Sequence, residues 1–172
     1  MTTSDIIAIS GVVVSGVSAI ASVTTLVFAK MALNTWKSQE ILKTKKDFKM
    51  ALLELKFIVM WLPEDINVDH LMIGRNLIYD SSGELKSKFV EKQVKAFENY
   101  AREFEKFEDA MQISARLWFA CEGLFKGSDV ENLWKGVYQA YNEYTQGRKN
   151  QNHFISKLDA LLIVDMYFDN PS

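Results

Sequence analysis

Residues 6–29 read IIAISGVVVSGVSAIASVTTLVFA, a stretch of 24 residues without a charged side chain. A helix rises about 1.5 Å per residue, so this stretch would be roughly 36 Å long, against about 30 Å for the hydrocarbon core of a bilayer. A buried core helix and a cleaved signal peptide are the alternatives. A signal peptide carries a basic region before its apolar segment, but residues 1–5 contain no lysine or arginine. The stretch therefore predicts a single transmembrane helix over 6–29.

The residues that follow this stretch are basic. Residues 30–57 contain seven lysines and three acidic residues, a net charge of +4. Because positive flanks remain on the cytoplasmic side, we expect residues 1–5 outside the cytoplasm and the C-terminal domain inside it, at the inner membrane if the source is bacterial. A basic collar near a membrane also favours anionic lipid headgroups, at about 1 kcal/mol per residue. The lysines expected to contact lipid are Lys30, Lys37, Lys43, Lys45 and Lys46.

The remainder of the chain has the opposite charge. Residues 58–172 contain 13 lysines and arginines and 18 acidic residues, a net charge of −5. This balance argues against nucleic acid as a constitutive partner, since phosphate binding requires a basic surface. The single cysteine, Cys121, cannot form an internal disulfide, which agrees with a reducing compartment.

No flexible linker follows the apolar stretch. Residues 31–62 contain no glycine or proline and are rich in strong helix formers, so we expect one helix to run through a juxtamembrane segment, 30–47, until Pro63 ends it. Its inward positions repeat every seven residues, and Lys45 interrupts them near the membrane. Beyond Phe48 the helix is apolar nearly all round, which predicts that its far end is buried within a bundle. The inward positions are Ile41, Phe48, Leu52, Leu55, Val59 and Leu62, and the additional apolar residues are Leu53, Phe57, Ile58, Met60 and Trp61.

Residues 84–168 predict three further helices. Ser81 and Glu84 have the spacing of a capping box, which predicts that a long helix begins there and ends at Gly127. A third helix should run from Ser128 to about Thr145 and a fourth from about Asn152 to Phe168. The long helix has a seam typical of a helical bundle and, less often, of an oligomeric coiled coil. Its positions are Val90, Phe97, Tyr100, Phe104, Phe107, Met111, Ser114, Trp118, Cys121 and Phe125. The predicted fold is all-α, with 48–172 forming an antiparallel four-helix-type bundle.

Small residues follow one face of the predicted transmembrane helix. They are spaced three and four residues apart, which allows two helix backbones to approach closely in lipid. This stripe predicts self-association through Gly11, Ser15, Ser18 and Ser22.

The sequence predicts no metal site and no cofactor. Both histidines follow an asparagine by three residues, where a di-iron bundle would place glutamate before histidine (Asn67–His70 and Asn150–His153). Cys121 lies at a core position, so we expect a buried side chain and not a nucleophile.

Arg148 and His153 form one catalytic pattern. Their Arg-x4-His spacing resembles that of HEPN ribonucleases, which are also small helical bundles. The resemblance implies that the arginine would polarise a phosphate and the histidine would assist attack by a ribose 2′-hydroxyl, usually across a dimer. Lys149 departs from the family, which often has a small polar residue there. The alternative interpretation is structural, with Arg148 in a solvated loop and His153 in the first turn of the last helix.

Together these features favour a non-enzymatic, membrane-anchored interaction module that self-associates or recruits a cytosolic protein. A membrane-tethered HEPN-like ribonuclease, acting as a toxin or defence effector, is the first alternative. An oligomerising effector that perturbs the membrane is the second.

Overall fold

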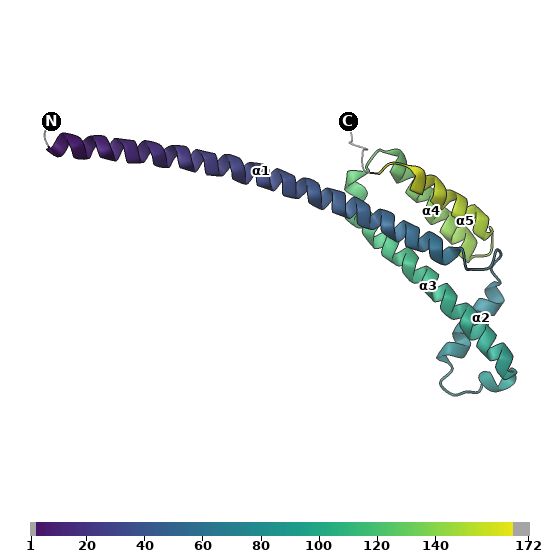
Figure 1. The fold of residues 1–172 in the computed structure, drawn as a ribbon. Coiled ribbons are helices and arrows are strands. Elements are labelled where there is room, and N and C mark those ends of the chain that lie inside the picture. The colour runs from purple at the N-terminus through teal and green to yellow at the C-terminus, as the bar shows by residue number, and fades with distance from the viewer. Residues whose placement is uncertain (1–2, 167–172) are drawn as a thin grey trace. The chain divides into compact units, whose positions relative to one another are not determined.

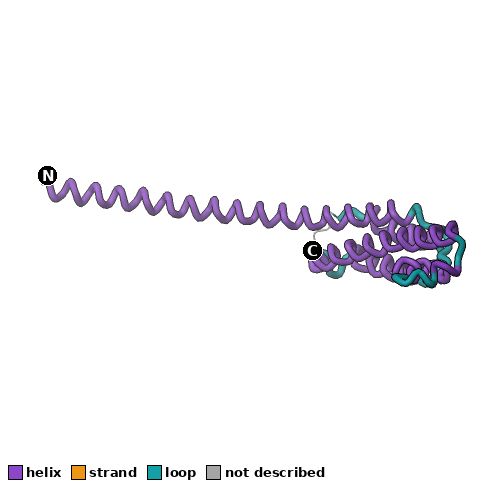
Figure 2. The backbone as a smooth tube through the Cα atoms, turned by 90° about the horizontal axis from the view of Figure 1, so that it is seen from below, coloured by secondary structure: helices purple, strands orange, loops and turns teal. Residues whose placement is uncertain are grey.

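The computed structural model describes the backbone of residues 3–166 and the side chains of residues 15–166. All regular elements in this part of the chain are helical (Figures 1 and 2). The chain divides into two compact units, 1–42 and 43–172. The elements are α1 (Thr3–Val59), α2 (Val68–Tyr79), η1 (Lys86–Lys88), α3 (Glu91–Cys121), η2 (Glu122–Leu124), α4 (Asp129–Thr145) and α5 (Gln151–Ile163).

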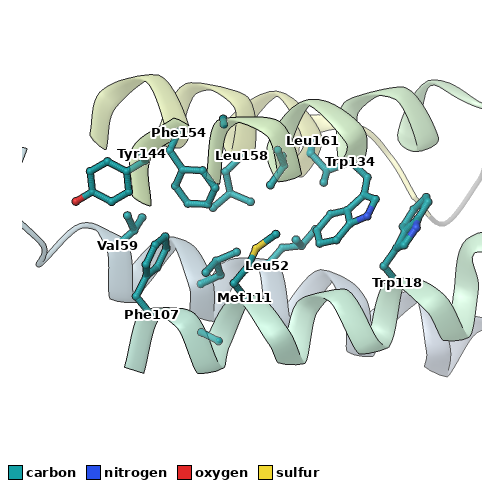
Figure 3. Close-up of a cluster of buried hydrophobic side chains, with 14 of the residues drawn as sticks. Leu52, Val59, Phe107, Met111, Trp118, Trp134, Tyr144, Phe154, Leu158 and Leu161 are labelled. Carbon is teal, nitrogen blue, oxygen red and sulfur yellow. The ribbon is translucent and has the colours of Figure 1, made fainter. Parts of the chain in front are cut away.

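The second unit has one continuous core, formed by the C-terminal part of α1 with α3, α4 and α5 (Figure 3). At one end, the ring of Phe48 lies 5.5 Å from the rings of both Trp118 and Trp134, measured between centroids. At the other end, Phe107 and Phe154 meet edge to face at 5.5 Å. Aromatic side chains bury large apolar areas and favour these offset or edge geometries, so they account for much of the packing between the four helices.

The end of α1 is fixed by contacts with residues far along the chain. The side-chain amide of Gln151 donates hydrogen bonds to the carbonyl oxygens of Val59 and Leu62, both at 2.6 Å. The Tyr144 hydroxyl donates to the Pro63 carbonyl, also at 2.6 Å. Helix ends leave carbonyls without intrahelical partners, and these bonds satisfy them while fastening α1 to α4 and α5.

Helices α2 and α3 pack at close range through Gly74. A Cβ atom built at this position would lie 2.1 Å from the Phe97 carbonyl oxygen and 2.9 Å from the Ala101 Cβ. Only glycine therefore allows the observed approach. The Arg75–Glu108 ion pair joins the same two helices at 2.5 Å.

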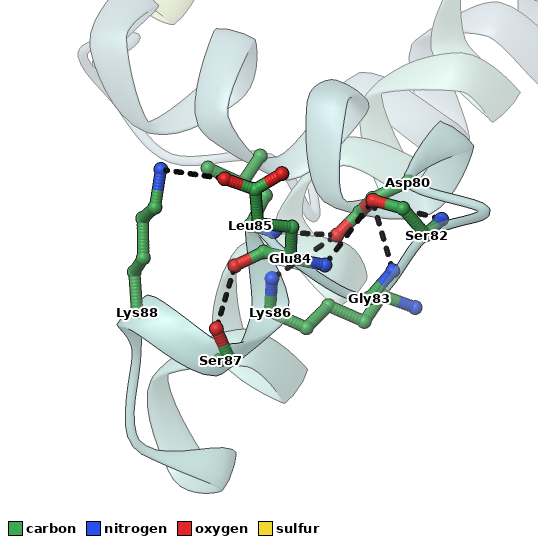
Figure 4. Close-up of polar contacts among 8 residues, drawn as sticks. All are labelled: Asp80, Ser82, Gly83, Glu84, Leu85, Lys86, Ser87 and Lys88. Carbon is green, nitrogen blue, oxygen red and sulfur yellow. Dashed lines mark hydrogen bonds and ion pairs between the residues drawn. The ribbon is translucent and has the colours of Figure 1, made fainter.

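The predicted capping box at Ser81 and Glu84 is wrong. Asp80 organises this turn instead: its carboxylate accepts hydrogen bonds from the Ser82 hydroxyl and from the backbone N–H groups of Ser82, Gly83, Leu85 and Lys86, at 2.7–3.2 Å (Figure 4). Because this turn and η1 occupy the chain after Asp80, α3 begins only at Glu91.

The predicted seam of α3 is buried from Phe104 onward, at Phe104, Phe107, Met111, Ser114, Trp118, Cys121 and Phe125. Phe97 and Tyr100 are half-buried, and Val90 is exposed because it precedes the helix. The predicted fourth helix begins at Gln151 and ends at Ile163, and Phe168 lies outside the described residues.

The predicted burial of the far end of α1 within a bundle holds for one face only. Phe48, Leu52, Leu55, Val59 and Leu62 are buried, whereas Leu53, Phe57, Met60 and Trp61 are exposed. The other helices of the second unit cover α1 on one face, and the opposite face has no neighbour among the described residues.

Candidate functional site

The N-terminal part of α1 is the candidate membrane span. Among the described residues, it contains an 18-residue window with a mean hydropathy of 1.6, none of which is buried. By length and composition alone, this helix could cross a membrane. Its hydroxyl groups are satisfied within the helix: Ser22, Thr24, Thr25 and Thr35 each donate to the carbonyl four residues earlier, at 2.8–3.0 Å. Such bonds lower the cost of placing a hydroxyl in an apolar medium.

The predicted self-association residues lie in this helix. Ser15, Ser18 and Ser22 are exposed, and Gly11 lies outside the residues whose side chains are described. The Ser22 hydroxyl donates to the Ser18 carbonyl at 2.9 Å. These positions therefore offer small size and close approach, with the Ser22 hydroxyl already bonded inside its own helix.

Of the five predicted headgroup lysines, Lys30, Lys37, Lys43 and Lys46 are exposed. Lys45 is only 6% exposed, and its ammonium lies 5.2 Å from the centroid of the Phe125 ring. A cation above an aromatic face is attracted by the ring's electron density. Lys45 therefore packs against the core of the second unit, unlike the other four lysines.

The exposed face of α1 in the second unit is a surface that the sequence reasoning missed. We call it the outer stripe and define it as Met50, Leu53, Phe57, Met60 and Trp61. Met50, Leu53 and Phe57 are three and four positions apart and share one face of α1, and Met60 and Trp61 follow in the turn after Val59. The available signal was this second periodicity, opposite the buried one.

A groove of about 640 Å³ lies between the end of α3 and the start of α4. Its lining includes the aromatic residues Trp118, Phe119, Trp134 and Tyr138 and the charged residues Glu122, Lys126, Glu131 and Lys135. The Lys135 ammonium donates to the Glu131 carboxylate at 2.6 Å, and the Gly127 N–H donates to the same carboxylate. These two bonds hold the pKa of Glu131 below its usual value. The groove therefore presents both apolar area and charge.

Arg148 and His153 line a shallow polar depression of about 420 Å³, together with Asp65, Lys149 and Asn150. The His153 Nε2 lies 3.3 Å from a carboxylate oxygen of Glu143. Hydrogen bonding from Gln139 and the nearby His153 lower the pKa of Glu143. The depression therefore combines a cation with an imidazole that is already paired to a carboxylate.

The structural interpretation of this segment is confirmed in one respect. His153 lies in the first turn of α5 and Arg148 in the preceding turn. The Asn150 side chain caps α5 by accepting from the His153 N–H at 3.1 Å, and Asn67 caps α2 by accepting from the His70 N–H at 3.0 Å. The repeated Asn-x-x-His spacing is thus a helix N-cap in both places.

Cys121 is fully buried in the core. Burial raises the pKa of its thiol to about 12, so the thiolate is scarce at neutral pH. Among the described residues, no group of three or more His, Cys, Asp and Glu side chains lies close enough to hold a metal ion.

Comparisons with known proteins found no matching family model, no matching curated protein and no matching solved structure.

Proposed function

We propose that this chain is a single-pass, membrane-anchored helical module that faces the cytosol and acts by self-association or by recruiting a protein. One observation carries the proposal: α1 is uncharged over residues 6–29 and exposed over residues 15–29, and it then supplies Phe48, Leu52, Leu55 and Val59 to the core of the second unit. An exposed apolar helix of this length requires an apolar environment, which lipid supplies.

The direction of insertion follows from charge. Lys30, Lys37, Lys43 and Lys46 are exposed and follow the uncharged stretch, so the positive-inside rule places the second unit in the cytosol. In this proposal α1, α3, α4 and α5 form an antiparallel four-helix-type bundle next to the membrane. Its exposed surface offers an apolar stripe and an aromatic groove, which suit binding to a protein better than chemistry.

Insertion can be tested by flotation and carbonate extraction of the full chain, with a topology reporter fused after Ser172. The chain should float with membranes, resist carbonate and show cytosolic reporter activity. Replacing Ile20→Lys and Val23→Lys should release it, because each lysine at mid-membrane costs roughly 3 kcal/mol. The matched control, Asn34→Lys with Thr35→Lys, adds the same charge outside the uncharged stretch and should leave flotation intact. A soluble wild-type chain would contradict the proposal.

A second candidate function is the HEPN-like ribonuclease, favoured by the position of Arg148 and His153 in one depression. We place it second because Asn150, Gln151 and His153 already have structural partners there. Purified full chain in detergent should show no RNA cleavage. Cleavage that is lost in both Arg148→Ala and His153→Ala, with unchanged circular dichroism and melting temperature, would reverse this order.

A further inference from the structure

The outer stripe is a run of exposed apolar side chains at the C-terminal end of α1, on the face opposite the one that contributes to the core. Met50 is 54% exposed, Leu53 43%, Phe57 65%, Met60 59% and Trp61 78%. The rings of Phe57 and Trp61 meet edge to face at 6.3 Å, yet both remain open to solvent. A contiguous apolar face of this kind marks an interaction surface more often than it marks chance.

The heptad arrangement of the stripe suits another helix. Met50 and Phe57 are seven residues apart, and Leu53 and Met60 are seven apart and offset by three. This is the spacing of the two inward positions of a left-handed coiled coil. The face therefore has the form of a seam two heptads long that lacks its partner helix within the described chain.

Charges of opposite sign flank the two sides of the stripe. Asp47 and Glu54 lie on one side, and Lys49 and Lys56 on the other, where the Lys56 ammonium pairs with Asp159 of α5 at 2.6 Å. In a parallel pair of helices, the side chain before one inward position faces the residue five positions later on the other helix. This rule places Lys49 opposite Glu54 of the partner subunit, and in a two-fold symmetric dimer this pair occurs twice. The face is thus complementary in charge to a second copy of itself.

The same heptad register includes the span. Counting back in sevens from Met50 reaches Ser22 and Ser15, and counting back from Leu53 reaches Ser18 and Gly11. The exposed lysines Lys43 and Lys46 occupy the same two series between these segments. In a pair of α1 helices, Lys43 and Lys46 would face the same lysines of the second copy and repel them. The contact between the two helices therefore divides into a membrane part and a soluble part.

We propose that the outer stripe is the soluble half of a parallel homodimer, in which α1 pairs with α1 of a second copy. The inference rests on the proposed function, because copies inserted in the same direction present the helix in parallel and bring identical residues together. Two heptads are too short to associate strongly from dilute solution. Tethering both copies to one membrane raises their effective concentration and makes the short seam sufficient.

Cysteine cross-linking of the full chain in its membrane tests this pairing. Leu53→Cys and Phe57→Cys should each give a disulfide-linked dimer under mild oxidation, several-fold more than Met72→Cys. Met72 is a matched control because it is an apolar residue of α2 with 57% exposure, outside both the stripe and the aromatic groove. The wild-type chain should give none, since Cys121 is buried.

A charge exchange tests the register independently. Glu54→Lys should weaken the Phe57→Cys cross-link several-fold, because it places lysines opposite each other. Adding Lys49→Glu should restore the cross-link. A parallel pair in this register predicts rescue, whereas a general loss of folding does not.

The outcomes separate the two proposals. Equal cross-linking at Phe57→Cys and Met72→Cys, in a chain that floats and has normal topology, overturns the homodimer and leaves the membrane module intact. Cross-linking of Phe57→Cys to a different protein, with no dimer, also overturns it and identifies the stripe as a site for another partner. Failure of the wild-type chain to float removes the membrane module and, with it, the parallel arrangement.

Discussion

The ammonium of Lys45 lies 5.2 Å from the centroid of the Phe125 ring. Phe125 in turn stacks on Trp118, with ring centroids 6.0 Å apart and planes 7° from parallel. The Lys45 ammonium thus lies beside the aromatic cluster that Phe125 forms with Trp118. This arrangement separates Lys45 from its exposed neighbours Lys43 and Lys46, although all three are adjacent in the basic segment.

Lys45→Ala should lower the free energy of unfolding by about 1 to 3 kcal/mol, through loss of the buried stem and of the cation above the ring. Lys46→Ala is the matched control and should change stability very little. The reverse order should hold for lipid: Lys46→Ala should reduce the anionic lipid that co-purifies with the chain, and Lys45→Ala should not. Denaturation in detergent and lipid analysis measure the two effects, and a stability loss in Lys46→Ala alone would contradict the assignment.

Gly74 and Gly136 are both helical glycines with opposite surroundings. A Cβ at Gly74 would collide with the Phe97 carbonyl oxygen, whereas a Cβ at Gly136 meets nothing within 4 Å. Gly74→Ala should therefore destabilise the domain by about 1 to 3 kcal/mol, because α2 must move away from α3. Gly136→Ala should stabilise it by roughly 0.5 to 1 kcal/mol through helix propensity. Chemical denaturation checks both signs, and a stabilising Gly74→Ala would refute the close approach.

The all-helical class and much of the core could be predicted from periodicity. Phe104, Phe107 and Met111 occupy the predicted seam and are buried. Their positions follow from the helical repeat, which depends on local spacing only.

The start of α3 could not be predicted in the same way. The side chains of Asp80 and Ser81 can both accept hydrogen bonds from the backbone N–H groups after α2, and the local sequence does not show which of them does so. Asp80 binds five donors in this turn, so the Ser81–Glu84 pattern does not form a cap.

The number of neighbours around a helix also escapes sequence reasoning. Phe57 and Leu55 are both apolar and two residues apart, yet one is 65% exposed and the other is fully buried. The heptad repeat predicts that Leu55 faces inward, but only the packing of α3, α4 and α5 shows that the opposite face of α1 is left uncovered. For the same reason the outer stripe emerged from the structure, while the spacing of Arg148 and His153 was visible in the sequence.

Trp118 and Phe119 are consecutive residues with opposite environments, 6% and 70% exposed. Trp118→Ala should lower the free energy of unfolding by roughly 3 to 5 kcal/mol, the usual cost of truncating a buried aromatic side chain. Phe119→Ala should change it by less than about 0.5 kcal/mol, as expected for an exposed position. Thermal unfolding of the full chain in detergent compares them. Similar losses in both variants would mean that Phe119 is covered in solution, and the aromatic groove would be the surface to examine.

Asp80 makes the turn between α2 and α3 sensitive to acid. The bond from the Ser82 hydroxyl, with the backbone bonds from Lys86, Leu85 and Gly83, holds the pKa of this carboxyl below its ordinary value of 3.8. A folded-state pKa below the unfolded one means that the carboxylate stabilises the fold above pH 3.8, and that this contribution is lost as the pH falls through the folded pKa. Asp80→Asn should therefore lower the melting temperature at neutral pH and increase hydrogen exchange at the Leu85 and Lys86 amides.

The same substitution should have a diminishing effect in acid, because the wild-type carboxyl then also becomes neutral. The difference in melting temperature between wild type and Asp80→Asn should shrink as the pH is lowered from 5 toward 3. Asp109→Asn provides the control. This substitution removes the same charge from an exposed position within α3, where the carboxylate does not organise a turn. A difference for Asp80→Asn that stays constant over this range would show that geometry, and not the charge of the carboxylate, holds the turn. Increased exchange confined to residues 80–90 would show that Asp80 acts locally, on the segment that delays the start of α3.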